Sequence, residues 1–208
     1  MIRRPLFAAV AVGGLAAAAA ALGVLAAVAA DAAPAARLYE VDPLHSSVRF
    51  GVPYELMVLG EVQGQFREFS GRVTYDPEAI AGSSVRVVIQ AASLDTGFAP
   101  RDRHLLGEDF FDAARFPTIT FESTRIEPAA GGHRLVGTLR LRGIAEEVAV
   151  PFRLVEVGDS LVVSGTVWLD RQAFGMGSPA ELAAGAFRLG ERVSVSLHLL
   201  LEPAGPAG

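Results

Sequence analysis

The sequence contains neither cysteine nor lysine. Without cysteine the chain has no disulfide bond, no thiolate zinc site, no cysteine nucleophile and no lipid anchor attached through cysteine. All 18 basic residues are arginines, and 23 acidic residues outnumber them, which gives a net charge of -5. A net negative charge does not favour the binding of nucleic acid, which is bound by basic surfaces. The G-x-S-x-G, H-E-x-x-H and P-loop patterns are also absent, so the sequence carries no catalytic signature of these classes.

The N-terminal segment, residues 1–36, is predicted to direct export. Arg3 and Arg4 precede a 25-residue uncharged run, Leu6–Ala30, of which 13 residues are alanine, and small residues follow it. This pattern is typical of a cleaved signal peptide. A retained membrane anchor is the alternative, because the run is long enough to span a bilayer. We therefore expect a periplasmic or otherwise exported protein, which contacts the membrane through this segment only if the segment is uncleaved.

Residues 37–202 are predicted to form one all-β domain, followed by a disordered tail at 203–208. Apolar residues recur at every second position, as in a half-buried strand, and Val193, Val195 and Leu197 show the pattern most clearly. The segment Val62–Tyr75 is long for one strand, and Arg67-Glu68 and Ser70-Gly71 interrupt it as a bend or bulge would. Closure into an eight-stranded antiparallel barrel would remove the exposed edges. The eight predicted strands lie near residues 47–52, 62–75, 85–92, 115–127, 135–142, 148–154, 161–169 and 193–199.

One short helical insertion is predicted within Ser93–Ser123. Pro100 suits its first turn, because proline lacks an N–H that would have no partner there. Asp102, Leu106 and Phe110 are spaced four apart and would share one face, with Leu105 beside them. The charged residues of this stretch form either an ion-pair cluster over a barrel end or a solvated face; they are Arg101, Asp102, Arg103, Glu108 and Asp109. A second short helix is predicted near Pro179–Ala184.

Two glycines, Gly137 and Gly165, fall at inward-facing positions among large aliphatic residues. Two interpretations are open. The glycines mark bends of the strands, or they leave a dry void that an apolar guest can enter.

Two of the four histidines are close to a carboxylate in the sequence. His45 follows Asp42, and His104 follows Asp102, while the other two lie in a glycine-rich turn and on a predicted solvent face. A metal site or an acid–base pair would require His45, His104 and a carboxylate to converge. The spacing alone is a weak signal for such a site.

A series of short motifs closely resembles the YceI-like family over about Leu38 to Leu201, in the order expected for that family. Together these motifs are specific, although no single one is. They are D-P-L-H-S-S-V-R-F at 42–50, G-Q-F at 64–66, F-S-G at 69–71, S-L-D-T at 93–96, R-D-R-H-L at 101–105, D-F-F-D at 109–112, F-P-T-I-T-F-E-S at 116–123, G-T-L-R-L-R-G at 137–143 and D-R-Q-A-F-G-M at 170–176.

This resemblance implies a lipocalin-like barrel that holds one isoprenoid lipid, with a polyprenyl or quinone-type tail, and that has no catalytic residues, cofactor or metal. Each methylene removed from water contributes about 0.8 kcal/mol to binding. A structural or stress-related exported barrel with no fixed ligand is the alternative, and a hydrolase or metalloenzyme is a third hypothesis. The residues predicted to line the lumen are Phe50, Val52, Phe66, Ile89, Phe121, Phe152, Val163 and Val195, with Leu105, Leu106, Phe110 and Phe111 closing one end.

Overall fold

A computed structural model provides the structure of the protein and describes residues 36–56, 58–177 and 188–205. The predicted export segment lies outside the described residues except for its last residue, and the helix predicted near Pro179–Ala184 also lies outside them. Within the described ranges, no helix has the length and apolar character needed to cross a membrane.

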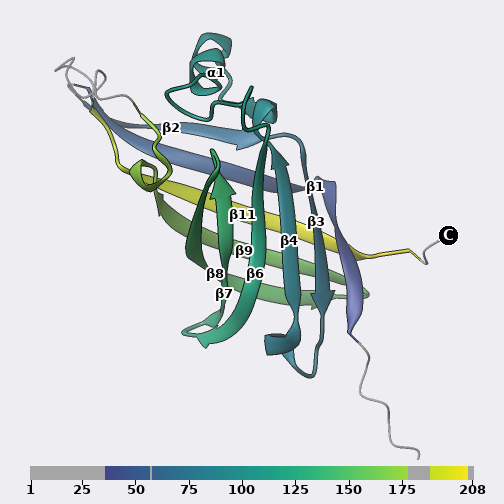
Figure 1. The fold of residues 1–208 in the computed structure, drawn as a ribbon. Coiled ribbons are helices and arrows are strands. Elements are labelled where there is room, and N and C mark those ends of the chain that lie inside the picture. Colours follow the sequence, from purple (N-terminus) through teal and green to yellow (C-terminus); the bar gives the residue numbers. More distant parts are fainter. Residues whose placement is uncertain (1–35, 57, 178–187, 206–208) are drawn as a thin grey trace, which may run out of the picture. The chain divides into compact units, whose positions relative to one another are not determined.

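The described residues form a closed barrel of eight antiparallel strands (Figure 1), which confirms the predicted fold class. Neighbouring barrel strands pair in chain order, and the last one returns to pair with the first between Tyr39 and Gly51. That pairing closes the sheet on itself, so that each barrel strand has a partner on both sides over at least part of its length. The barrel strands are β1 (Arg37–Leu56), β3 (Phe69–Tyr75), β4 (Ser84–Gln90), β6 (Thr118–Ala129), β7 (Gly132–Leu141), β8 (Ile144–Val157), β9 (Ser160–Asp170) and β11 (Arg192–Pro203).

Strand β1 changes partner along its 20 residues. Its first residues pair with β3, and its second half folds back on β2 (Val58–Phe66) as a hairpin. β2 and β3 therefore form one run along β1, broken at Arg67-Glu68 as the sequence predicts, whereas Ser70-Gly71 remains paired with β4. Two short strands, β5 (Leu94–Asp95) and β10 (Arg188–Leu189), pair with β2 and β1 and extend this end of the barrel.

A single α-helix in the described chain, α1 (Ala99–Leu105), covers one end of the barrel (Figure 1). Pro100 lies in its first turn, as predicted. Three 3-10 turns complete the helical structure of the described ranges. They are η1 (Ile80–Gly82), η2 (Ala91–Ser93) and η3 (Gln172–Phe174).

The predicted helical face of Asp102, Leu106 and Phe110 is wrong. Leu106 is the C-cap of α1, and the backbone then turns tightly, with the Gly107 N–H donating to the His104 carbonyl at 3.1 Å. Phe110 lies in the turns that follow, where it is only 4% exposed. Its burial comes from the folding of this loop against the barrel and not from helical periodicity.

The predicted tail begins too early. β11 extends to Pro203, and the N–H of Ala204 donates to the carbonyl of Leu38 at 2.8 Å. The chain is therefore still paired with β1 two residues beyond the predicted end of the domain, because the edge of β1 offers backbone acceptors there.

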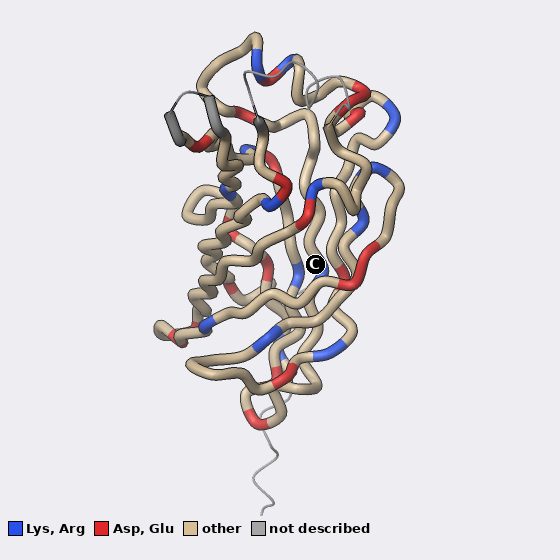
Figure 2. The backbone as a smooth tube through the Cα atoms, turned by 90° about the vertical axis from the view of Figure 1, so that its left-hand side faces the viewer, with Lys and Arg blue, Asp and Glu red and all other residues tan. Residues whose placement is uncertain are grey.

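The apolar faces of the strands meet inside the barrel, and charged residues of both signs are interspersed along the strands and turns (Figure 2). Tyr75, which is 8% exposed, donates its hydroxyl to Oε1 of Glu156 at 2.7 Å. Burial of the phenol and the adjacent Glu156 carboxylate raise the pKa of Tyr75 to about 12. The buried Tyr75 hydroxyl thus has a hydrogen-bond partner in Glu156, as is usual for buried polar groups.

Candidate functional site

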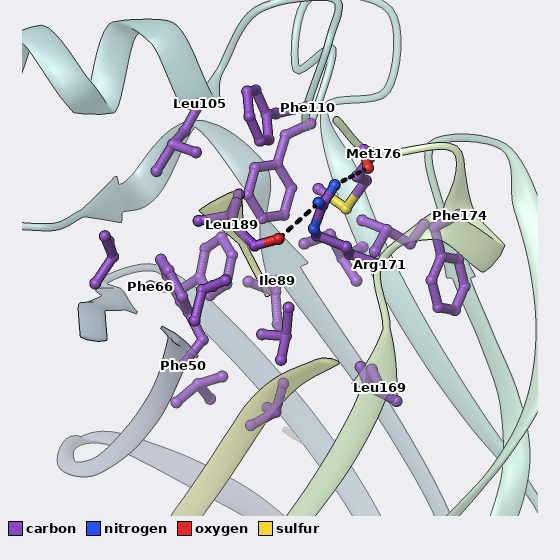
Figure 3. Close-up of a pocket in the computed structure, with 18 of the residues that line it drawn as sticks. Phe50, Phe66, Ile89, Leu105, Phe110, Leu169, Arg171, Phe174, Met176 and Leu189 are labelled. Atoms are coloured by element: carbon purple, nitrogen blue, oxygen red, sulfur yellow. Dashed lines mark hydrogen bonds between the residues drawn. The ribbon is translucent and has the colours of Figure 1, made fainter. Parts of the chain in front are cut away.

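The barrel encloses a cavity of about 340 Å³ at the end covered by α1, named here the α1-side cavity (Figure 3). Strand residues form its walls, and α1 and the turns after it close one side. Its volume lies at the lower end of the range of about 300–1,000 Å³ that is usual for small-molecule sites. Among the described residues that line it, only Arg101, His104 and Arg171 have polar side chains.

A second cavity of about 150 Å³, the deep cavity, lies further along the barrel and reaches Ile80 of η1. Tyr75 and Ser83 are the only polar side chains among its described lining residues. The two cavities share five apolar side chains, which we call the waist: Val48, Ile89, Leu139, Leu169 and Val195. The cavities are therefore consecutive parts of one apolar lumen, separated only by side chains.

The structure brings eleven of the twelve sequence-predicted residues to this lumen. Leu106 is the exception, because as the C-cap of α1 it packs against the core without lining either cavity. Whether the others contact a ligand stays a prediction. The α1-side cavity is lined by Phe50, Val52, Phe66, Leu105, Phe110 and Phe111, the deep cavity by Phe121, Phe152 and Val163, and both by Ile89 and Val195.

Aromatic rings form one wall of the α1-side cavity. The ring of Phe66 lies between those of Phe50 and Phe111, with centroid separations of 5.7 and 5.6 Å. Edge-on and tilted pairs at such distances are favourable beyond the area they bury. Gly64 makes the arrangement possible, since a Cβ at that position would come within 2.3 Å of the Phe50 ring. The wall is thus fixed in shape by the packing of its own rings.

The two inward glycines do not leave a void. A Cβ at Gly137 would lie 2.4 Å from the Glu122 carbonyl oxygen and 2.6 Å from the Phe121 ring. A Cβ at Gly165 would lie 2.4 Å from the carbonyl oxygen of Pro151. Both glycines permit close approach of a neighbouring backbone. The open space of the lumen lies elsewhere, between the larger apolar side chains.

Arg171 is a functional candidate that the sequence analysis missed. It is 6% exposed, lines the α1-side cavity, and donates three hydrogen bonds to backbone carbonyls. Figure 3 shows the bonds to Met176 and Leu189. Nε donates to Gly190 at 2.8 Å, Nη1 to Met176 at 2.6 Å and Nη2 to Leu189 at 3.2 Å. No described carboxylate forms an ion pair with it. Strand alternation carries the missing signal, because inward-facing Leu169 predicts an inward side chain two positions later.

The charged residues of α1 hold the helix in place through Thr96. Oδ1 of Asp102 accepts the backbone N–H of Thr96 at 3.0 Å and its hydroxyl at 2.5 Å. Arg101 donates from Nε to the same hydroxyl oxygen at 2.8 Å and from Nη2 to the Thr96 carbonyl at 2.9 Å. Within the described ranges no ion pair joins two members of the predicted charged cluster. Hydrogen bonds between Thr96 and the side chains of Arg101 and Asp102 hold the helix instead.

The histidine–carboxylate pair formed by His45 and Asp42 lies at the surface of β1. Nδ1 of His45 is 2.5 Å from Oδ2 of Asp42, and the His45 side chain is largely exposed. The hydrogen bond between them raises the pKa of His45 and lowers that of Asp42. In the described part of the chain no three His, Asp or Glu side chains are grouped to hold a metal. The pair therefore remains a local contact, without the third group that the hydrolase or metalloenzyme hypothesis requires.

Comparison with curated proteins identifies close sequence relatives over part of the chain. A Yersinia pestis protein named UPF0312 is 33% identical over 123 residues, which is 58% of this chain and 63% of the relative. A UPF0312 protein of Vibrio vulnificus is 36% identical over 115 residues, covering 55% of this chain and 60% of the relative. The matches span less than two thirds of the length of these relatives.

Solved structures with the same fold include BcnA of Burkholderia cenocepacia, with a TM-score of 0.70 and 30% identity over 77% of this chain and 98% of that one. A polyisoprenoid-binding domain from Saccharophagus degradans has a TM-score of 0.60 and 18% identity, over 80% and 98% of the two chains. The family model of the YceI-like domain matches residues 39–201. This match covers all described residues that line the two cavities and the barrel except for two residues at each end. The chain therefore belongs to the YceI-like family.

Proposed function

We propose that this protein is an exported binding protein that holds one long isoprenoid chain lengthwise in the barrel lumen. The observation that carries the proposal is the pair of consecutive apolar cavities joined at the waist. A lumen of this kind suits a hydrocarbon chain, since each buried methylene contributes about 0.8 kcal/mol and an apolar cavity stays dry. The polyisoprenoid-binding domain of the same fold supports the choice of ligand class.

The arginine and histidine side chains at one end of the lumen support one orientation of the ligand. Arg101, His104 and Arg171 all line the α1-side cavity, so a head group with oxygen acceptors would lie there and the tail would extend past the waist. Arg171 donates three of the five N–H groups of its guanidinium to backbone carbonyls. A quinone carbonyl, a hydroxyl or a phosphate of the head group would accept hydrogen bonds from the remaining N–H groups.

The side chains that the structure describes around the α1-side cavity also favour binding over hydrolysis. A hydrolase would need a nucleophile or an activated water beside an acid–base group. The polar side chains that line the α1-side cavity are two arginines and His104, and no described carboxylate, serine or threonine lines it to act as a nucleophile or to orient the histidine. A barrel without a fixed ligand would be expected to fill its lumen with its own side chains, and about 340 Å³ remains open.

Mass spectrometry of organic extracts from natively purified protein tests the proposal, followed by uptake of a polyprenol and of a quinone by the delipidated protein. Val195→Phe enlarges a waist side chain and should reduce the bound amount or shorten the bound chain. It should cost less than the roughly 1–3 kcal/mol of an overpacked core, because the cavities on both sides can accept the ring. Val155→Phe is the matched control, since Val155 is 58% exposed on the outer face.

Wild-type protein that carries no isoprenoid and takes up neither probe would contradict the proposal. A large loss of stability in Val195→Phe, combined with that result, would instead support a barrel whose lumen is closed at the waist and has no fixed ligand.

A further inference from the structure

The wall of the barrel is interrupted between β8 and β9. The two strands pair only from Phe152 with Gly165 to Val157 with Ser160. Beyond that point β8 remains paired with β7 alone and β9 with β11 alone. The unpaired stretches are Ile144–Pro151 and Thr166–Asp170, which we call the β8–β9 gap; in the described chain no backbone hydrogen bond crosses it. The strands can be followed in Figure 1.

The point where the pairing ends has a local cause. The Pro151 carbonyl approaches Gly165 so closely that a Cβ there would lie 2.4 Å from it. Pro151 has no N–H to donate to a neighbouring strand, so it suits the end of a ladder and not its middle. The two strands then continue without a shared ladder toward the end of the barrel where Arg171 lies.

A notch of about 260 Å³ occupies the outer side of the gap. Val148, Val167 and Leu169 line both this notch and the deep cavity, and Leu169 and Phe174 line both the notch and the α1-side cavity. A single layer of apolar side chains therefore separates solvent from both parts of the lumen. Trp168 lies at the outer rim, 51% exposed, with the Arg192 guanidinium 5.7 Å from its ring centroid.

Opening the wall here would leave the barrel ladders intact, since none crosses the gap. Arg142, in the turn before β8, bridges the open end: its Nη1 donates to the carbonyl of Gly175, which follows η3 beyond β9. Its Nη2 donates to the carbonyl of Glu108 at 2.7 Å. Movement of a few apolar side chains and loss of this bridge would connect the lumen to the surface.

We propose that the β8–β9 gap is a lateral entrance through which the apolar chain of the ligand passes sideways into the lumen. This inference rests on the proposed function. The ligand part that would pass through the gap is a hydrocarbon chain, because the side chains lining the inner side of the gap are apolar and continuous with the lumen. Sideways entry would let the tail settle past the waist while an oxygen-bearing head stays near Arg171, at the open end of the gap. Trp168 offers the entering lipid an amphipathic ring at the rim.

The absence of native cysteines permits a direct test. Ala149→Cys with Ala173→Cys places two thiols on exposed positions that line opposite sides of the notch. Bismaleimides of graded length would join them in the folded full-length protein. The matched control is Arg153→Cys with Ser164→Cys, an exposed pair that faces across the paired part of the same two strands. Uptake of a polyprenol from phosphatidylcholine vesicles is followed in time, and the bound amount is measured at equilibrium.

Bridging the gap should slow uptake about tenfold or more, which corresponds to about 1.4 kcal/mol of barrier, without lowering the bound amount at equilibrium. The bridged control pair should take up lipid at the wild-type rate. Arg142→Gln, which removes the bridge between the two sides, should speed uptake and release together. Unchanged uptake in the bridged Ala149–Ala173 variant would overturn the lateral entrance while leaving lipid binding in place.

Absence of binding of both a polyprenol and a quinone in the unmodified wild type would instead refute the proposed function itself. A stable dimer that is disrupted by labelling Ala149→Cys alone would assign the gap to a second copy of the chain, and would also overturn the inference.

Discussion

Replacing Arg171 by methionine is expected to destabilise the barrel substantially. The guanidinium holds the carbonyls of Met176, Leu189 and Gly190 together and is 6% exposed, so its removal leaves three acceptors without this donor. Hydrogen bonds to a charged donor are worth about 1.5–3 kcal/mol each. Against this, methionine relieves the desolvation of a buried cation, which costs several kcal/mol.

The loss of the three hydrogen bonds should outweigh the relief of desolvation. Methionine has a similar length but supplies no donor to any of the three carbonyls. We expect a net loss of about 2–4 kcal/mol in the free energy of unfolding. For a domain of this size, each kcal/mol shifts the Tm by about 2–4 °C, so Tm should fall by about 4–16 °C. Differential scanning calorimetry of the delipidated protein measures the shift without a contribution from bound lipid.

Two further variants separate the causes of the shift. Arg171→Lys keeps the charge but loses the planar fork that reaches three acceptors at once, and should recover little of the stability. Arg49→Ala removes an exposed arginine of β1 and should change the Tm by little. If Arg171→Met and Arg49→Ala melted alike, the three hydrogen bonds would contribute nothing measurable, and the reasoning would be refuted.

Two predictions concern other parts of the chain. Because folding raises the pKa of Tyr75 from 10.0 to about 12, the folded state holds the phenol proton more tightly, and the free energy of unfolding should fall as the pH rises from about 10 to about 12. Tyr75→Phe should remove that part of the decline in urea titrations, and an identical decline in both proteins would contradict the assignment. The exported protein should begin within residues 30–37, which N-terminal sequencing checks; an intact Met1 in a membrane fraction that needs detergent would establish a retained anchor.

The strand positions and most lumen residues could be predicted because alternation is a local property of the sequence. Val163 and Val195 point inward for the same reason that their neighbours point outward, and the structure places both at the cavities. Arg171 follows the same alternation, yet an arginine at an inward position contradicts the rule that charged residues are exposed. Two of its three acceptors, the carbonyls of Leu189 and Gly190, come from a segment 18 and 19 residues further on, which no local pattern reveals.

The size and openness of the lumen could not be predicted from glycine positions. Gly165 marks a close backbone contact with another strand, and that contact depends on register and on the partner, which are long-range properties. The end of α1 was likewise set by turns closing after Gly107 and not by the spacing of Leu106 and Phe110. The β8–β9 gap could not be predicted either, because Pro151 suits the end of a ladder but does not show on which side of β8 the pairing stops.

The pairing of β1 with β11 governs how this barrel must fold. The closing contacts join residues 39–51 to residues 194–203, at nearly the full sequence separation of the domain. Such contacts carry a high entropy of loop closure and slow folding in β-proteins. The barrel cannot close until β11 has been synthesised, so the nascent domain remains open until that point. A C-terminal truncation before Arg192 would therefore leave β1 and β9 as exposed edges and produce an aggregation-prone chain.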